Sequence, residues 1–122
     1  MSSLFVAAGH DGHRIVSENG ADWKNEQSGK EGETYRAVAF GAGRFVAVGS
    51  YGGDNIHAHT ADGLTWESGK KAAGYSKYIR GLGFDGEQFI GIGGDPGSVG
   101  DAKPFIVTSP DGSNWSDYVS IP

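Results

Sequence analysis

One seven-residue pattern occurs three times in this chain of 122 residues and restricts the folds open to it. Each copy runs Ser or Thr, any residue, Asp or Asn, Gly, two variable residues and Trp. The copies read SENGADW at 17–23, TADGLTW at 60–66 and SPDGSNW at 109–115. Recurrence at intervals of 43 and 49 residues is typical of repeat proteins, in which each copy is one supersecondary unit that packs on its neighbours.

An apolar stretch that ends in glycine precedes each turn. Each stretch places an aromatic residue four positions before the glycine, and the three read LFVAAG (4–9), RFVAVG (44–49) and QFIGIG (88–93). Short apolar runs of this kind favour β-strands that are buried on both faces.

A further strand is expected before the second and third stretches. RAVAFGAGRF (36–45) and RGLGFDGEQF (80–89) align without gaps. Gly43 and Gly86 lie where a tight hairpin turn needs a residue that accepts a positive φ. For the second copy we therefore expect four strands, at 36–41, 44–49, 55–62 and 64–69.

Four-stranded units at this period are typical of β-propeller blades. We predict an all-β protein, a partial propeller of about three blades, each a four-stranded antiparallel sheet. The chain is expected to form one domain, 1–122, with blades at approximately 4–27, 34–69 and 78–119. The 22 glycines are interleaved with apolar residues, which fits many short strands and argues against disorder.

The repeated turn resembles the Asp-box of the bacterial-neuraminidase-type (BNR) repeats found in sialidase-like propellers. The acid and the tryptophan are one residue closer here than in the usual Asp-box form. The resemblance covers nearly the whole chain and implies the propeller fold, which hosts many unrelated activities. The positions that it marks as the structural Asp-box are Ser17, Asn19, Gly20, Trp23, Thr60, Asp62, Gly63, Trp66, Ser109, Asp111, Gly112 and Trp115.

Elementary chemistry predicts a structural role for this turn. The side-chain oxygens of Asn19, Asp62 and Asp111 can accept backbone N–H groups, as in an Asx-turn, while the Ser or Thr caps the same loop. The glycines permit φ > 0, and we expect each tryptophan to fill the gap toward the next blade. Calcium or sugar binding by the acid and the tryptophan is the alternative.

The strand count predicts an incomplete ring. Eleven strands are expected because the first copy lacks the strand that precedes its apolar stretch, whereas propellers close with about four to eight blades. Open sheet edges and faces favour assembly. We expect either a homodimer that completes about six blades or a complementary fragment.

The strand order predicts that the loops at one edge carry any binding site, because binding residues concentrate on loops over a rigid scaffold. Arg36 and Arg80 are equivalent in the repeat and can bind a carboxylate or phosphate; pairing with acids such as Asp54 or Asp85 is the alternative. The tyrosines can stack on a sugar or pack on their own loop glycines. The candidate ligand-binding residues are Arg36, Arg80, Tyr35, Tyr51, Asp54 and Tyr78.

Neither a catalytic site nor a metal site is assigned. His57 and His59 share a strand face, but local spacing supplies no third ligand, so we expect no metal and no cofactor. The arginine triad that the sialidase resemblance implies cannot be assigned to the four arginines present. No pair of carboxylates is marked for glycoside hydrolysis.

Charge and hydropathy exclude two kinds of partner. The net charge is −5, which disfavours nucleic acid, and no apolar run approaches the roughly 20 residues of a membrane span. No signal peptide is recognisable, and the compartment stays open between cytoplasmic and secreted bacterial. The predicted function is a non-catalytic propeller scaffold that binds carbohydrate in the manner of a lectin. A fragment of a sialidase-like glycoside hydrolase and a purely architectural or engineered propeller fragment are the alternatives.

Overall fold

The protein is all-β, as the sequence predicts. The computed structural model describes residues 4–29, 31–51, 54–73, 79–93, 104–116 and 119–120, and every structural statement below refers to these. Within them there is no helix, and so none that is long and apolar enough to cross a membrane. The strands are β1 (Phe5–Ala8), β2 (Arg14–Ser17), β3 (Trp23–Gln27), β4 (Thr34–Gly41), β5 (Arg44–Tyr51), β6 (Asp54–Thr60), β7 (Glu67–Ala73), β8 (Ile79–Phe84), β9 (Phe89–Gly93), β10 (Phe105–Ser109) and β11 (Val119–Ser120).

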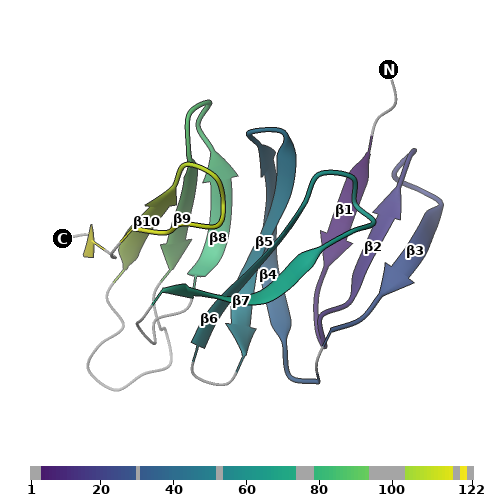
Figure 1. Cartoon of the computed structure of the whole chain (residues 1–122), viewed down its shortest axis with the longest axis horizontal. Helices are drawn as coiled ribbons and strands as arrows, with labels where there is room; N and C mark the ends of the chain where they lie inside the picture. Colours follow the sequence, from purple (N-terminus) through teal and green to yellow (C-terminus); the bar gives the residue numbers. More distant parts are fainter. Residues whose placement is uncertain are drawn as a thin grey trace.

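The strands form three antiparallel sheets that follow one another along the chain (Figure 1). Sheet 1 has the order β1-β2-β3, sheet 2 the order β4-β5-β6-β7, and sheet 3 the order β8-β9-β10-β11. Strand β4 of sheet 2 contacts both β1 and β8. Sheet 2 therefore lies between the other two.

The three sheets share one register in their equivalent strand pairs. The aromatic residue that opens each apolar stretch pairs with the Ser or Thr that opens each turn. The pairs are Phe5 with Ser17, Phe45 with Thr60 and Phe89 with Ser109. Since the side-chain period of a strand is two, a shared register places equivalent residues on the same face of each sheet.

Two apolar clusters hold the sheets together. One lies between sheets 2 and 3 and is built on Val46, Val48, Phe89 and Val107, all fully buried. The other lies between sheets 1 and 2 and includes Tyr35, Ala47, Ile56 and Ala58, with Ala8 packed against it. Each large apolar side chain buried in this way stabilises the fold by about 1.5–3 kcal/mol.

The repeated turns have the hydrogen bonds that the sequence predicts. In the second copy the Leu64 and Thr65 N–H groups both donate to Asp62 Oδ1 at 2.8 Å, and the Gly63 N–H donates to Thr60 Oγ1 at 2.9 Å. Asn19 and Asp111 accept the corresponding pairs of N–H groups in the other two turns. The glycines of the three turns have φ of 80°, 79° and 80°.

The hairpin prediction is also confirmed. Ala42 and Gly43 connect β4 to β5 with φ of 50° and 76°, and Gly86 has a φ of 103° in the equivalent connection. Two consecutive residues with positive φ give the turn whose twist matches the flanking strands.

All four strands of the second copy differ from the predicted bounds; β5 ends at Tyr51 rather than at residue 49, and β6 runs from Asp54 to Thr60 rather than over 55–62. The last strand of the second copy was expected at 64–69 but runs from Glu67 to Ala73, because the hydrogen-bonded turn occupies the residues up to Trp66. Strand β4 begins at Thr34 rather than at residue 36. Tyr35 and Tyr51 therefore belong to strands, although the repeat pattern predicts loops at both positions.

Candidate functional site

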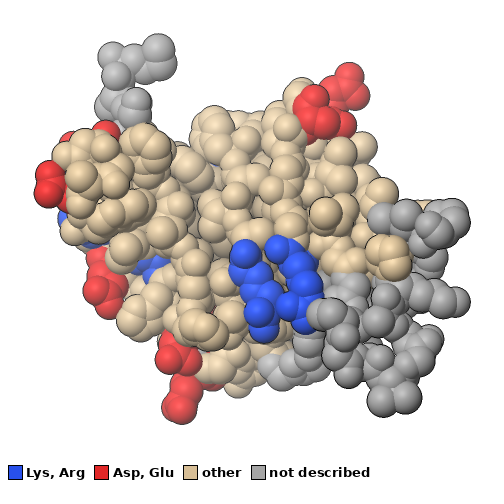
Figure 2. Space-filling model, turned by 180° about the vertical axis from the view of Figure 1, so that it is seen from behind, with Lys and Arg blue, Asp and Glu red and all other residues tan. Residues whose placement is uncertain are grey.

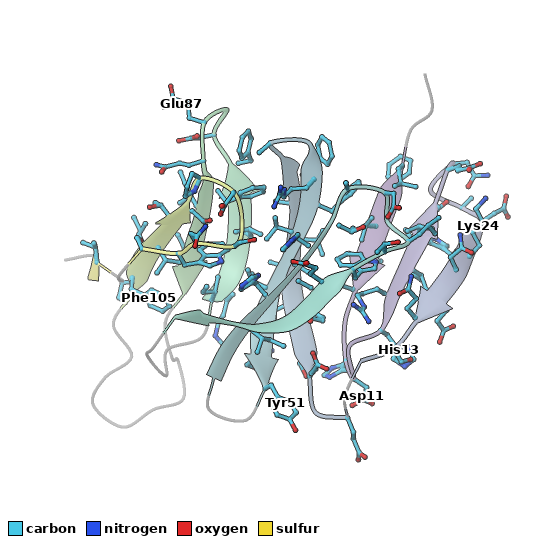
Figure 3. The ribbon with its side chains drawn as sticks, in the orientation of Figure 1. Asp11, His13, Lys24, Tyr51, Glu87 and Phe105 are labelled. Carbon is cyan, nitrogen blue, oxygen red and sulfur yellow. The ribbon has the colours of Figure 1, made fainter. Side chains whose placement is uncertain are left out.

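The β1–β2 and β3–β4 connections lie at one edge of the sheets. Figure 3 places Asp11 and Tyr51 at one edge of the sheets and Glu87 at the opposite edge. We call the first of these the loop edge; its described connections are residues 9–13, between β1 and β2, and 28–33, between β3 and β4 (residue 30 excepted).

Backbone hydrogen bonds join these two connections. The Gly12 N–H donates to the Glu33 carbonyl at 2.9 Å, and the Gly29 N–H donates to the Asp11 carbonyl at 3.0 Å. The Asp11 carboxylate accepts the Gly32 N–H at 3.0 Å. The loop edge of sheets 1 and 2 is therefore one continuous scaffold.

Glycine is required where the two connections cross. Gly12 has a φ of 66°, and a Cβ at this position would lie 2.6 Å from Gly29 Cα. A Cβ at Gly29 would in turn lie 2.7 Å from Glu33 Oε1. There is thus no room for a side chain where the two connections cross. The Glu33 carboxylate packs directly against Gly29.

Glu33 and Tyr35 are buried together beneath the loop edge. The Tyr35 hydroxyl donates to Glu33 Oε2 at 3.3 Å, and only 3% of Tyr35 is exposed. The ring of Tyr35, which was predicted to bind a ligand, is part of the core between sheets 1 and 2. The sequence contains no local signal for this burial.

Arg36 and Arg80 occupy equivalent and unusual positions. Each lies at a register shift of the first strand of its sheet: Tyr35 pairs with Gly49 and Ala37 with Val48, so that Arg36 is the additional residue. Arg80 is the additional residue between Ile79 and Gly81. Both arginines are exposed. Such β-bulges redirect a side chain and are frequent next to functional sites.

Positive charge is gathered on one face of the molecule. Figure 2 shows a compact cluster of Lys and Arg side chains in the middle of that face, with acidic side chains toward its rim. The strands that carry Arg36 and Arg80, β4 and β8, are in contact. A shallow hollow of about 360 Å³ lies beside Arg80 and is also lined by Ile92 and Pro104, a volume within the range of small-ligand sites.

Tyr51, Asp54 and Tyr78 are the other predicted site residues. Tyr51 is exposed, and its ring lies beside Gly32 of the 28–33 connection. Asp54 pairs through its backbone with Tyr51 at the start of β6, and Tyr78 lies outside the described residues. Asp85 follows the far end of β8, where it accepts the Glu87 and Gln88 N–H groups instead of an arginine.

His57 and His59 pack against other side chains of the protein. The rings of His57 and His59 are stacked with centroids 6.1 Å apart. His59 Nε2 lies 3.1 Å from Glu67 Oε2, and its Nδ1 lies 3.3 Å from the Ser113 hydroxyl. Across the described ranges, no group of three His, Asp or Glu side chains is arranged to hold a metal ion.

The acids of the repeated turns are held ionised by the backbone. Burial raises the pKa of Asp111, but hydrogen bonds from the Asn114 and Ser113 N–H groups outweigh it and bring the pKa well below the usual 3.8. The pKa of Asp62 is lowered by the Thr65 and Leu64 N–H groups. These carboxylates therefore stabilise the turn by accepting its backbone N–H groups.

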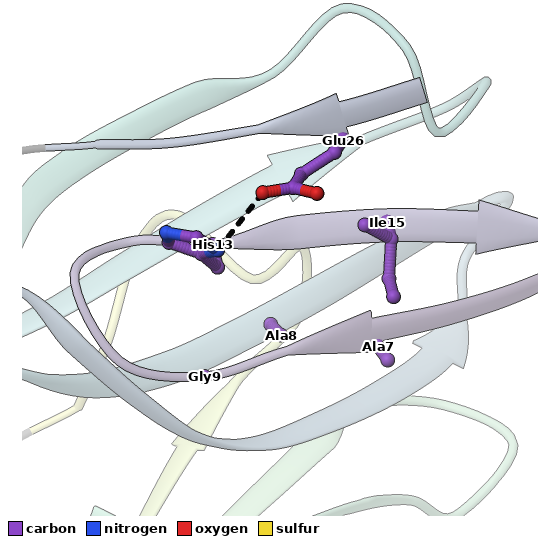
Figure 4. Close-up of a pocket in the computed structure, with 6 residues that line it drawn as sticks. All are labelled: Ala7, Ala8, Gly9, His13, Ile15 and Glu26. Atoms are coloured by element: carbon purple, nitrogen blue, oxygen red, sulfur yellow. Dashed lines mark ion pairs between the residues drawn. The ribbon is translucent and has the colours of Figure 1, made fainter. Parts of the chain in front are cut away.

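A second hollow lies on the outer face of sheet 1 (Figure 4). Ala7 and Ile15 form its floor, and His13 and Glu26 lie at its rim with His13 Nδ1 3.3 Å from Glu26 Oε1. Both of these polar side chains are more than half exposed, so water screens the pair.

Fold and site together define an all-β protein of three stacked antiparallel sheets, two of which carry an exposed arginine at the equivalent bulge of the first strand. Comparison of the chain with family models, with curated proteins and with solved structures gave no match in any of the three.

Proposed function

We propose that the protein is a non-catalytic binding scaffold built from β-propeller blades of the Asp-box type. The common register of the three sheets, the identical hydrogen bonds of the three turns and the stacking of each sheet on the next support this proposal. A stack of equivalent units holds its connecting loops in fixed positions, which is the use that repeat proteins make of such scaffolds.

The ligand proposed for this scaffold is an acidic carbohydrate. The observation that carries the proposal is that Arg36 and Arg80 are both bulge residues, exposed, on strands that touch. A guanidinium donates two parallel hydrogen bonds to a carboxylate, which gives orientation as well as attraction.

Binding to an array that pairs acidic sugars with their neutral counterparts tests this function. The wild-type protein should bind the acidic members, and Arg36→Ala or Arg80→Ala should weaken binding by about 10- to 100-fold, the loss expected for a charged hydrogen bond. Lys24→Ala is the matched control, because Lys24 is an exposed cation paired with Glu18 on sheet 1.

Two results would contradict the proposal. Equal binding of acidic and neutral sugars, or loss of binding in Lys24→Ala equal to that in Arg80→Ala, would remove the role of the two arginines. Hydrolysis of a bound sialoside would show that the scaffold is catalytic.

A further inference from the structure

Every sheet in this protein has two distinct faces. Because the three sheets share one register, each face of one sheet has an equivalent face in the other two. We call the face that carries Val6 in sheet 1, Val46 in sheet 2 and Ile90 in sheet 3 the leading face. The opposite face carries Ala7, Ala47 and Gly91 and is called the trailing face. Strand alternation assigns the remaining residues to one face or the other.

The leading face of each sheet packs on the trailing face of the next. Ala8, on the leading face of sheet 1, packs against Ala47 and Ala58 of sheet 2. Val46 and Val48, on the leading face of sheet 2, pack against sheet 3. The same type of interface is therefore made twice within the chain.

The tryptophan of each turn takes part in this interface. Trp66 of sheet 2 lies under Arg14 of sheet 1, with the guanidinium 5.3 Å from the ring centroid. Trp115 of sheet 3 lies beside His57 of sheet 2, with centroids 6.5 Å apart. Arg14 pairs with Ala8 and His57 with Val48, so they hold equivalent positions; the third equivalent is Ile106, which pairs with Ile92.

The glycines of the turns dock on the leading face in the same way. Gly63 lies against Val16 of sheet 1, and Gly112 lies against Val46 of sheet 2. Both glycines are buried, whereas Gly20, in the turn of sheet 1, is exposed. Trp23 of that turn is 43% exposed, while Trp66 and Trp115 are partly buried.

Two faces in the described part of the chain are consequently left open, and they are complementary. Sheet 3 has an open leading face with Ile90, Ile106 and Ile92, the last 51% exposed. Sheet 1 has an open trailing face with Ile15 and Trp23, hollowed as Figure 4 shows. The repeated interface joins a leading face to a trailing face. The open leading face of sheet 3 and the open trailing face of sheet 1 are therefore its two sides.

We propose that the leading face of sheet 3 binds the trailing face of sheet 1 of a second copy of this chain. In this contact Ile106 lies over Trp23 of the second copy, as Arg14 lies over Trp66. The contact made twice joins six sheets, a number within the four to eight blades of closed propellers, so two chains form a ring. The inference rests on the stacked scaffold of the proposed function and is independent of its ligand.

Sedimentation equilibrium tests the contact. The wild-type protein should have the mass of two chains. Ile92→Glu and Trp23→Glu should each halve this mass, because both side chains are exposed in the single chain and a charge there is desolvated only in the contact. Leu64→Glu is the matched control: Leu64 is 49% exposed, lies on neither open face and should leave the mass unchanged.

The effect of Trp23→Glu distinguishes head-to-tail binding from pairing of two identical faces. If sheet 3 bound sheet 3 of the second copy, Ile92→Glu would halve the mass and Trp23→Glu would not. A mixture of the two variants should recover part of the two-chain mass, since one of the two contacts in a mixed pair then joins two intact faces.

Disulfide formation provides an independent measurement. The chain has no cysteine, so a Trp23→Cys, Ile106→Cys double variant should form cross-links between chains on oxidation. Neither single variant should cross-link, because head-to-tail contact brings position 23 to position 106 and not to itself.

Each remaining outcome bears on one proposal. A wild-type mass of one chain overturns the contact and assigns the open faces to another partner, and retained sugar binding in that monomer leaves the proposed function standing. Assemblies larger than two chains that both variants dissolve support the contact and overturn the two-chain ring. Two-chain mass without sugar binding overturns the ligand alone.

Discussion

The guanidinium of Arg14 lies 5.3 Å from the centroid of the Trp66 ring and joins sheet 1 to sheet 2. Arg14 is only 5% exposed, and its Nε donates to the Gly12 carbonyl at 2.9 Å. Its Nη1 is buried without a hydrogen-bond partner among the described residues. The side chain therefore stabilises the interface by packing and cation–π attraction while its charge is incompletely solvated.

Replacement of Arg14 should separate these two contributions. Arg14→Ala removes the contact with Trp66 and leaves a cavity, so we expect the free energy of unfolding in urea to fall by about 2–3 kcal/mol. Arg14→Met keeps the apolar stem and removes the buried charge, and it should cost less than half as much. A loss for Arg14→Met as large as that for Arg14→Ala would show that the charge dominates.

The three turn glycines form a natural series for testing how turns dock on neighbouring sheets. All three have φ near 80°, so alanine strains each backbone by about 1–2 kcal/mol. A Cβ at Gly20 would have no neighbour nearer than 3.8 Å, whereas at Gly63 it would lie 2.8 Å from Val16, and at Gly112 it would overlap Val46.

Gly63→Ala and Gly112→Ala should therefore destabilise the protein by about 1–3 kcal/mol more than Gly20→Ala does. The unfolding free energies are compared in the Ile92→Glu background, which removes the proposed contact between copies. Equal losses at all three glycines would mean that backbone strain alone decides the effect.

Asp111 should be replaceable by asparagine but not by alanine. Its Oδ1 accepts the Ser113 N–H at 2.8 Å and the Asn114 N–H at 2.9 Å. Asp111→Ala leaves both donors without this acceptor, and we expect thermal unfolding to report a loss of about 1–3 kcal/mol.

Asp111→Asn keeps the acceptor, and Asn19 performs the same role in the first turn. The loss for this variant should stay below about 1 kcal/mol. A loss equal to that of Asp111→Ala would show that the negative charge, rather than the hydrogen-bond geometry, stabilises the turn.

Acid should destabilise the protein through the same turns. The pKa values of Asp62 and Asp111 lie below 3.8 because backbone N–H groups bind their ionised forms. Below pH 3.8 the unfolded chain therefore binds more protons than the folded chain, so stability present at neutral pH is lost as the pH falls. Urea midpoints measured from pH 7 to about pH 2 should decline most steeply in this acidic range.

An Asp62→Asn, Asp111→Asn double variant should show a shallower decline over the same range, since neither turn then takes up a proton. The equivalent residue of the first turn, Asn19, has no carboxylate to titrate, so no corresponding change is made there. An unchanged slope in the double variant would assign the acid sensitivity to other carboxylates, such as Asp85, whose pKa is also lowered, by the Gln88 and Glu87 N–H groups.

The local chemistry of this chain was predictable in detail. Asn19, Asp62 and Asp111 accept the expected N–H groups, and Gly43 and Gly86 have the expected positive φ. These hydrogen bonds and dihedral angles depend on residues two or three positions apart. The seven-residue motif therefore contains the residues that determine each turn. The identification of the sheets as Asp-box propeller blades stays a prediction.

The candidate site was predictable only in part. The repeat singled out Arg36 and Arg80 as equivalent. The bulges at these arginines arise because the preceding residues, Tyr35 and Ile79, pair with glycines 14 positions along the chain, Gly49 and Gly93. Tyr35 was expected at the surface and is buried beside Glu33. Its environment is supplied by sheet 1, which no local pattern encodes.

The sequence by itself determined the turns, the strand order within each unit and the equivalence of the units, because hydrogen bonds between near neighbours and alternation along strands depend on local residues alone. Only the tertiary structure decided which face of each sheet packs on the next, that Arg14 meets Trp66, and which two faces stay open. Burial is a property of residues distant in sequence that share a surface, so it appears only once the sheets are stacked.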